Sequence, residues 1–354
     1  NQGNTLKPEV YLLTESNGFF GQRLMPWESM DVDALVRILS EHFSVVRATY
    51  SEIANGAVRP KDSIVIHSSS QQPEYKVFID DLLLFLLSNG NLLVPSIHAT
   101  RSHENKGYQE LHKKLRGVQS PKGFYVGKLT EIDRTEIAYP IVFKEVCGFG
   151  SSGVRLVHSE SELLEASAAE WRLTWREAAK ALKTCLGYIV RKHIFRRKNL
   201  RPYGDYYEPL KRFVLQNYIP GLSQDFKVLA FQNRMFVLKR EVRPQDFRAS
   251  GSGRFRFDEP PNGLLDFASE LLRQFDEPYM SFDICLDGSN YHLIEFQGVH
   301  FGPFTLMQAP KHFQRQAGGW NATTGPVRLE AVVGESLVLF LQRADQGGKI
   351  GGVS

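Results

Sequence analysis

Two acidic residues and a glutamine flank a short turn in the C-terminal part of the chain. Asp283 lies in an apolar run before segment 287–290 (DGSN), and Glu295 and Gln297 lie in the apolar run after it. This composition is typical of a β-hairpin turn. With a three-residue loop at 288–290, Asp283 pairs opposite Glu295, and the two-residue period of a strand puts Gln297 on the same face.

Two carboxylates and an amide that converge between apolar strands favour a cation among them. Neighbouring carboxylates cannot both stay ionised in a dry environment. Mg²⁺ prefers hard oxygen ligands, takes one or two carboxylates, and completes its shell with waters and phosphate oxygens. The sequence therefore predicts a nucleotide-metal site made of Asp283, Glu295 and Gln297. A surface hairpin with outward polar residues is the alternative interpretation.

The composition is that of a globular protein large enough for two or three domains. The chain has 354 residues, of which 42% are hydrophobic and 23% charged, and its formal net charge is +4. This charge is too small to predict a nucleic-acid partner, and no apolar run reaches the length of a membrane span. The three cysteines lack CxxC spacing, which argues against a disulfide framework or zinc site and predicts a cytoplasmic location.

The expected elements divide the chain into parts. Apolar runs at 9–13, 63–67 and 91–95 predict strands, and helical spacing at 31–43 and 75–87 alternates with them, as in a parallel α/β layer. Later segments predict hairpins and helices instead. The expected units are an N-terminal domain at 1–104, a central subdomain at 105–221, a C-terminal subdomain at 222–344 and a flexible tail at 345–354.

A basic segment and a glycine-rich loop stand out in the central part. Residues 171–212 show little periodicity and are expected to be an insertion; their basic cluster is either an anionic-substrate patch or a solvated face. A strand ending at Lys144 leads into the loop 148–153 (GFGSSG), and a second strand follows. Small residues let backbone N–H groups approach phosphate oxygens. A phosphate cradle and an ordinary hairpin turn both remain open.

Taken in order, these segments resemble the ATP-grasp superfamily over about residues 106–302. The chain resembles the D-alanine–D-alanine ligase, glutathione synthetase and ribosomal-protein glutamate-ligase branches of this superfamily. The resemblance rests on Asn105-Lys106, YPIVFK at 139–144, the glycine loop, FVLQNYIPG at 213–221 and the metal hairpin. It implies an α/β (α+β) fold with an N-terminal parallel α/β layer, a central mobile α+β subdomain, and a C-terminal antiparallel sheet with helices.

The resemblance also implies roles for individual residues. Two lysines would contact the α- and β-phosphates of ATP, the glycine loop would cover the triphosphate, and the segment from Gln216 would read the adenine. The residues implied for ATP are Lys106, Lys144, Gly148, Gly150, Ser151, Ser152, Gly153, Gln216, Asn217, Tyr218, Ile219 and Asp225, the last on the ribose. The residues implied for catalysis are Arg240, Arg248 and Lys227. Solvated strand positions are the alternative for Lys227 and Arg240.

The implied activity is ATP- and Mg²⁺-dependent ligation of a carboxylate to an amine through an acylphosphate, with one or two Mg²⁺ ions or Mn²⁺ in their place. Gln297 stands where the family usually has Asn, which leaves the second metal open. A phosphotransferase and a non-catalytic ATP-binding regulator are the alternatives. The expected partners are small-molecule, peptide or glycan carboxylates and amines, with neither nucleic acid nor membrane; a homodimer remains open.

Overall fold

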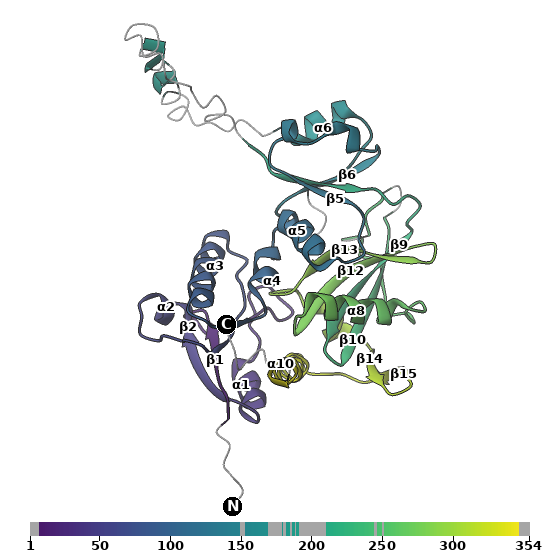
Figure 1. Cartoon of the computed structure of the whole chain (residues 1–354). Helices are drawn as coiled ribbons and strands as arrows, with labels where there is room; N and C mark the ends of the chain where they lie inside the picture. Colours follow the sequence, from purple (N-terminus) through teal and green to yellow (C-terminus); the bar gives the residue numbers. More distant parts are fainter. Residues whose placement is uncertain are drawn as a thin grey trace, which may run out of the picture.

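The computed structural model describes three β-sheets with helices around them (Figure 1). The described residues are 7–148, 153–168, 179, 182–184, 186–187, 189–190, 210–243, 246–249 and 251–346. Most of the basic insertion, the loop residues Gly150, Ser151 and Ser152, and nearly all of the expected tail lie outside them. One sheet is parallel and two are antiparallel, which confirms the predicted α/β class. Within these ranges no helix has the length and apolar character to cross a membrane.

The N-terminal layer is a parallel sheet with the strand order β2-β1-β3-β4. Its strands are β1 (Glu9–Thr14), β2 (Ser44–Thr49), β3 (Ile64–Ile66) and β4 (Leu92–Val94), and its helices are α1 (Val32–Ser40), α2 (Tyr50–Ala54), α3 (Pro73–Ser88) and α4 (Ile97–Ser102). The sequence predicts all three other strands but not β2. As an edge strand, β2 is only partly buried and lacks a continuous apolar run.

The second sheet is antiparallel and has the order β5-β8-β6-β7. Its strands are β5 (Gly123–Val126), β6 (Ile141–Glu145), β7 (Val154–Val157) and β8 (Phe213–Asn217), accompanied by α5 (Lys106–Arg116), α6 (Glu160–Ser167) and the short turns η1 (Leu129–Glu131) and η2 (Arg134–Glu136). Strands β6 and β7 flank the glycine loop, as the sequence predicts.

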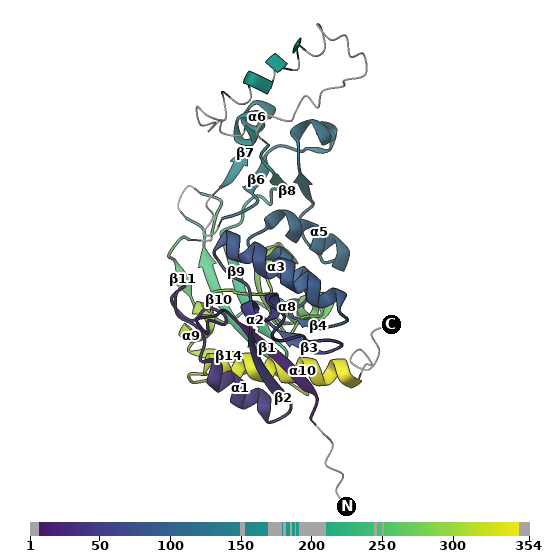
Figure 2. The same ribbon diagram turned by 90° about the vertical axis from the view of Figure 1, so that its left-hand side faces the viewer.

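The largest sheet is antiparallel and has the order β13-β12-β9-β10-β14-β15, with β11 paired to β10. Its strands are β9 (Gln224–Phe231), β10 (Arg234–Glu241), β11 (Phe255–Arg256), β12 (Tyr279–Asp287), β13 (Asn290–Gln297), β14 (Lys311–Gln316) and β15 (Gly319–Thr324). Its helices are α8 (Leu264–Phe275), α9 (Phe304–Gln308) and α10 (Leu329–Gln346). Figure 2 shows α10 alongside α1, and one apolar core joins both helices to the N-terminal layer and this sheet.

Helix α8 follows from its apolar spacing. Its buried residues are Leu264, Leu265, Ala268, Leu271, Leu272 and Phe275. They recur at the three- and four-residue steps of one helix face, and they share a core with side chains of β9 and β12. The helix ends at Phe275, and the residue that caps it, Asp276, has a left-handed backbone with φ of 57°. Strand β12 begins three residues later, so the packing of α8 supports the strand that carries Asp283.

The hairpin β12–β13 brings the predicted acids face to face. Asp283 pairs with Glu295, as the sequence predicts, but the turn has two residues rather than three, because Asp287 pairs with Asn290. Ile294 is a bulged residue with no partner in β12, and it supplies the one-residue shift in register that the shorter turn lacks. A bulge inserts one unpaired residue in one strand. The three-residue loop was therefore wrong, and the pairing of the acids was right.

Candidate functional site

A cavity of about 250 Å³ lies between the second sheet and the largest sheet. Fourteen predicted site residues line it: Lys106, Lys144, Gly148, Gln216, Asn217, Tyr218, Ile219, Asp225, Lys227, Arg240, Arg248, Asp283, Glu295 and Gln297. Gly153 is described but does not line it. Gly150, Ser151 and Ser152 lie outside the described residues. The structure therefore gathers side chains that are nearly two hundred positions apart in sequence around one space.

Two buried lysines line the cavity on the side of the second sheet. Lys106 begins α5, where Asn105 caps the helix by accepting a hydrogen bond from the backbone N–H of Tyr108. Its Nζ donates to the carbonyl of Gly148 at 2.5 Å. Lys144 is near the end of β6; burial lowers its pKa to about 8, and the neighbouring cations Lys113 and Lys106 act in the same direction.

An ion-paired cluster lines the opposite side of the cavity. Arg240 makes a bidentate contact with Asp225, with both N–O distances 2.7 Å, and its Nη2 lies 2.9 Å from Asp283. Lys227 lies 3.2 Å from the other oxygen of Asp283. Burial alone would raise the pKa of Asp283, but Arg240 and Lys227 hold it well below its usual range. The solvated alternative for Arg240 is wrong, because its side chain is 6% exposed.

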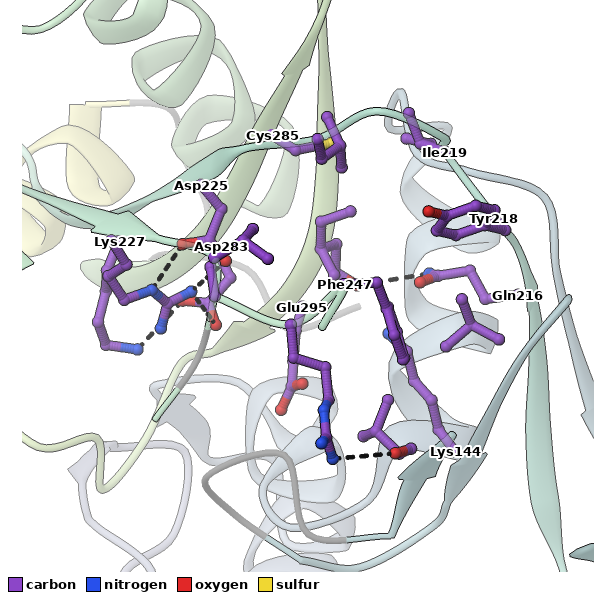
Figure 3. Close-up of a pocket in the computed structure, with 18 of the residues that line it drawn as sticks. Lys144, Gln216, Tyr218, Ile219, Asp225, Lys227, Phe247, Asp283, Cys285 and Glu295 are labelled. Carbon is purple, nitrogen blue, oxygen red and sulfur yellow. Dashed lines mark hydrogen bonds and ion pairs between the residues drawn. The ribbon is translucent and has the colours of Figure 1, made fainter. Parts of the chain in front are cut away.

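Strand register explains this cluster. Arg240 of β10 is directly opposite Asp225 of β9, and Lys227 of β9 is directly opposite Asp283 of β12. Directly opposed residues of antiparallel strands have Cβ atoms about 5 Å apart. Figure 3 shows Asp225, Lys227 and Asp283 on one side of the pocket and Lys144, Gln216 and Tyr218 on the other. The two sets face each other across a single opening.

The segment 246–249 reaches across the cavity from the largest sheet. Arg248 lies 2.7 Å from Asp246, which raises the pKa of the guanidinium, and its Nη1 donates to the carbonyl of Val154 in β7 at 3.3 Å. Phe247 lines the cavity. Its ring lies edge-on to the ring of Tyr218, with 6.1 Å between the two ring centroids. Arg248 was predicted from the sequence, but Phe247 was not, because an aromatic residue in a loop carries no periodic signal.

The oxygen donors suit Mg²⁺ better than a soft metal. Glu295 and Gln297 line the cavity two residues apart in β13, and carboxylate and amide oxygens are hard ligands. In the described part of the chain no group of three His, Cys, Asp or Glu residues could hold a metal ion by itself. Both oxygens of Asp283 meet cations, so this carboxylate would have to exchange partners to ligate a metal.

Comparison with solved structures identifies the fold. The D-cycloserine synthetase DcsG is 11% identical, with a TM-score of 0.50 over 94% of this chain and 99% of that chain. The ATP-grasp ligase PsnB, complexed with minimal precursor, Mg and ADP, is also 11% identical, with a TM-score of 0.50 over 94% of this chain and 98% of that chain. This chain therefore has the ATP-grasp fold. In sequence comparisons, no family model and no curated protein matches it.

Proposed function

We propose that this protein is an ATP- and Mg²⁺-dependent ligase that joins a carboxylate to an amine through an acylphosphate, releasing ADP and phosphate. One observation supports the proposal: cations from two sheets and an oxygen-donor set line the same cavity of an ATP-grasp fold. Phosphoryl transfer depends mainly on positioning and on neutralising phosphate charge. A cavity with these groups has what such a reaction requires.

The proposed reaction has two steps. An oxygen of the donor carboxylate attacks the γ-phosphorus of ATP, the bond from that phosphorus to the β–γ bridging oxygen breaks, and ADP leaves with the electron pair. The amine nitrogen then attacks the acyl carbon, phosphate leaves with the electron pair of the C–O bond, and the amine loses a proton. No nucleophilic side chain is required. Burial raises the pKa of the Cys285 thiol to about 12, so it stays protonated at neutral pH.

Lysines, arginines and acidic residues would each have a separate role around the phosphates of ATP. Lys106 and Lys144 would bind the α- and β-phosphates, and Arg240, Arg248 and Lys227 would neutralise the transferred group and the acyl intermediate. Mg²⁺, one or two ions, would neutralise phosphate oxygens, and Asp283, Glu295 and Gln297 would hold it. Arg240 and Lys227 would then exchange carboxylate oxygens for phosphate oxygens.

The remaining lining residues would hold the nucleoside. The Gln216 side chain would meet the exocyclic amine of adenine, the backbone from Asn217 to Ile219 would read the base edge, and Asp225 would bind the ribose. The loop from Gly148 to Gly153 would cover the triphosphate. We also propose the division into units at 1–104, 105–221 and 222–344, and a cytoplasmic location.

The substrates we propose are a peptide or small-molecule carboxylate and an amine. PsnB was solved with a precursor, and DcsG is a synthetase of a small molecule, so the fold accommodates both kinds of substrate. The test is ADP release in a panel of carboxylates and amines, with hydroxylamine present to capture an acylphosphate as a hydroxamate. A hydroxamate that requires both ATP and a carboxylate supports the ligase.

Two other results would favour the alternatives. A stable phosphoester without hydroxamate would identify a phosphotransferase. Metal-dependent ATP binding without ADP release, for every substrate tried, would favour a regulator. Failure to bind ATP in the presence of Mg²⁺ would exclude the ligase, the phosphotransferase and the regulator.

A further inference from the structure

A buried ion pair lies beside the cavity, and the proposed chemistry does not use it. Glu110 and Lys113 of α5 are one turn apart, with an N–O distance of 2.5 Å, and their side chains are 5% and 2% exposed. Burying two charges costs several kcal/mol per ion before their attraction repays it. A buried ion pair is therefore weak evidence that the two residues serve stability. Their contacts with other residues are a better guide to their role.

The pair contacts the side-chain amide of Gln216 through Glu110. Glu110 Oε1 lies 3.4 Å from Gln216 Nε2, which is also 3.5 Å from the carbonyl oxygen of Ile294. A carboxylate and a backbone carbonyl are acceptors only, so both require the NH₂ side of the amide. No hydrogen-bond donor among the described residues meets Gln216 Oε1. Since Gln216 lines the cavity, its carbonyl oxygen is the group left to a ligand.

Two backbone features build this network. Gly123 of β5 is the cross-strand partner of Gln216, and a Cβ at Gly123 would lie 2.1 Å from Glu110 Oε2. The glycine therefore leaves the space that the carboxylate occupies. Ile294 is the bulged residue of β13, and its carbonyl also accepts a hydrogen bond from Lys113 Nζ at 3.4 Å. A strand, a helix and a bulge thus converge on one amide.

We propose that Glu110 and Lys113 are positioning residues that fix Gln216 with its carbonyl oxygen toward the base, and so make the cavity select adenine over guanine. Adenine presents an amine donor at its sixth position, where guanine presents a carbonyl acceptor. A fixed acceptor on the protein attracts the first and repels the second. An amide free to turn would offer its NH₂ to guanine instead. This inference rests on the proposed function, because it takes ATP as the ligand of this cavity.

The main test compares ATP and GTP binding to the full chain with Mg²⁺ by isothermal titration calorimetry. The variant is the double substitution Glu110→Leu with Lys113→Leu, because removing both charges avoids an unpaired buried charge. The wild type should prefer ATP by at least roughly tenfold, and the variant should lose about tenfold of that preference, the value of one hydrogen bond of about 1.4 kcal/mol. If Glu110 and Lys113 had a merely structural role, the variant would bind ATP and GTP more weakly by the same factor.

Two further variants strengthen the test. Adding Gln216→Glu to the double variant should restore the preference for ATP, since a carboxylate is an acceptor in either orientation. Gly123→Ala keeps the pair but displaces the Glu110 carboxylate, so the preference should fall there as well. Gly127→Ala is its matched control: the nearest atom to a Cβ at Gly127 is 3.4 Å away, and the preference should stay.

The outcomes separate this inference from the proposed function. An ATP-to-GTP ratio that is unchanged in the folded double variant, or in Gly123→Ala, overturns the inference and leaves the ligase proposal standing. Equal binding of ATP and GTP by the wild type does the same. If the wild type binds neither nucleotide, both fail. A ratio that falls in these variants and returns with Gln216→Glu supports the positioning role.

Discussion

Lys144 and Arg240 carry the same charge in one cavity, but their surroundings differ. Arg240 contacts two carboxylates. Lys144 is 6% exposed and has no ion-pair partner within 4 Å among the described residues. Since burial lowers its pKa to about 8, Lys144 is the cation whose charge changes within the range of ordinary assays.

The charge of Lys144 should make ATP binding depend on pH. A lysine is protonated below its pKa, so affinity should be highest below pH 8 and fall as Lys144 loses its proton. Calorimetric titration of ATP between pH 6.5 and pH 9.5 measures this. Lys144→Arg is the control, because arginine stays charged throughout, and its profile should be flat above pH 8. Equal slopes for the two proteins would contradict the assignment.

Removal of Glu295 tests the proposed metal site. Glu295→Ala should abolish the Mg²⁺-dependent part of ATP affinity and lower ADP formation by roughly 100-fold or more, on the scale of lost metal-site contacts. The melting temperature should stay close to that of the wild type, because Glu295 lies in the cavity wall. The matched control is Glu270→Ala on the exposed face of α8, where Glu270, among the described residues, pairs only with Arg273 and Gln274 of the same helix. A full Mg²⁺ effect in Glu295→Ala would exclude Glu295 as a ligand.

Single residues could be placed at the cavity from the sequence where the signal was local. Lys106, Lys144 and Gln216 each stand at or next to one end of a helix or strand that the sequence predicts. All three line the cavity. The sharing of one guanidinium by Asp225 and Asp283 was not predicted. It requires the order of three strands in the sheet, and sequence spacing gives no strand order.

At the scale of elements, Gly298 fixes how closely α4 approaches β13. A Cβ there would lie 2.7 Å from the Cβ of Ala99 and 2.9 Å from Met280 Sδ. Gly298→Ala should lower the free energy of unfolding by about 1–3 kcal/mol, the usual cost of overpacking. Urea denaturation measures this.

The control for Gly298 is Gly302→Ala. There the nearest atom to a Cβ is a side-chain nitrogen of Gln22 at 3.4 Å, so stability should change by no more than about 0.5 kcal/mol. If the two variants are equally stable, close packing at Gly298 is not what holds α4 in place.

Elements with a strong apolar pattern were predicted, and polar edge strands were missed. Strand β12 and helix α8 are largely buried. Strand β15, with the sequence GWNATT, is an edge strand whose last four residues are exposed, so hydrophobic spacing could not reveal it. The bulge at Ile294 was hidden for another reason. A two-residue turn with one bulge and a three-residue turn without one give the same pairing of Asp283 with Glu295.

At the scale of the whole molecule, Glu277 connects the N-terminal layer to the largest sheet. Its fully buried carboxylate accepts hydrogen bonds from the backbone N–H, at 2.9 Å, and the hydroxyl of Ser96, which caps α4. Its backbone carbonyl accepts one from Gln232 at 2.8 Å. Burial raises the pKa of Glu277 to about 7. The connection between the N-terminal layer and the largest sheet therefore includes a carboxyl group whose pKa is near neutral pH.

This pKa predicts how stability varies with pH. Between pH 4.5 and pH 7 the folded protein holds a proton at Glu277 that the unfolded chain has released, so this group contributes less stability as pH rises. Glu277→Gln should therefore gain free energy of unfolding relative to wild type from pH 5 to pH 8, by up to about 3 kcal/mol. Urea denaturation at both pH values measures it.

The control for Glu277 is Glu74→Gln on the exposed first turn of α3, which should show no such difference between pH 5 and pH 8. A Glu277→Gln variant that follows the wild type at both pH values would contradict the prediction.

The assembly of the molecule was only partly predictable. The alternation of strands and helices predicts the parallel layer, and hairpins predict the antiparallel sheets. That α10 packs beside α1 (Figure 2) depends on contacts between the two ends of the chain, which local spacing cannot show.

The bulge in β13 has a practical consequence. Ile294 is the one residue of β13 that has no partner in β12. A chain shortened by that single position would close into a regular ladder and still set Asp283 against Glu295, but it would lose the carbonyl that meets Lys113 and Gln216. One deletion would thus separate the end of the cavity proposed to hold the metal from the end proposed to bind the base, so that each could be engineered separately.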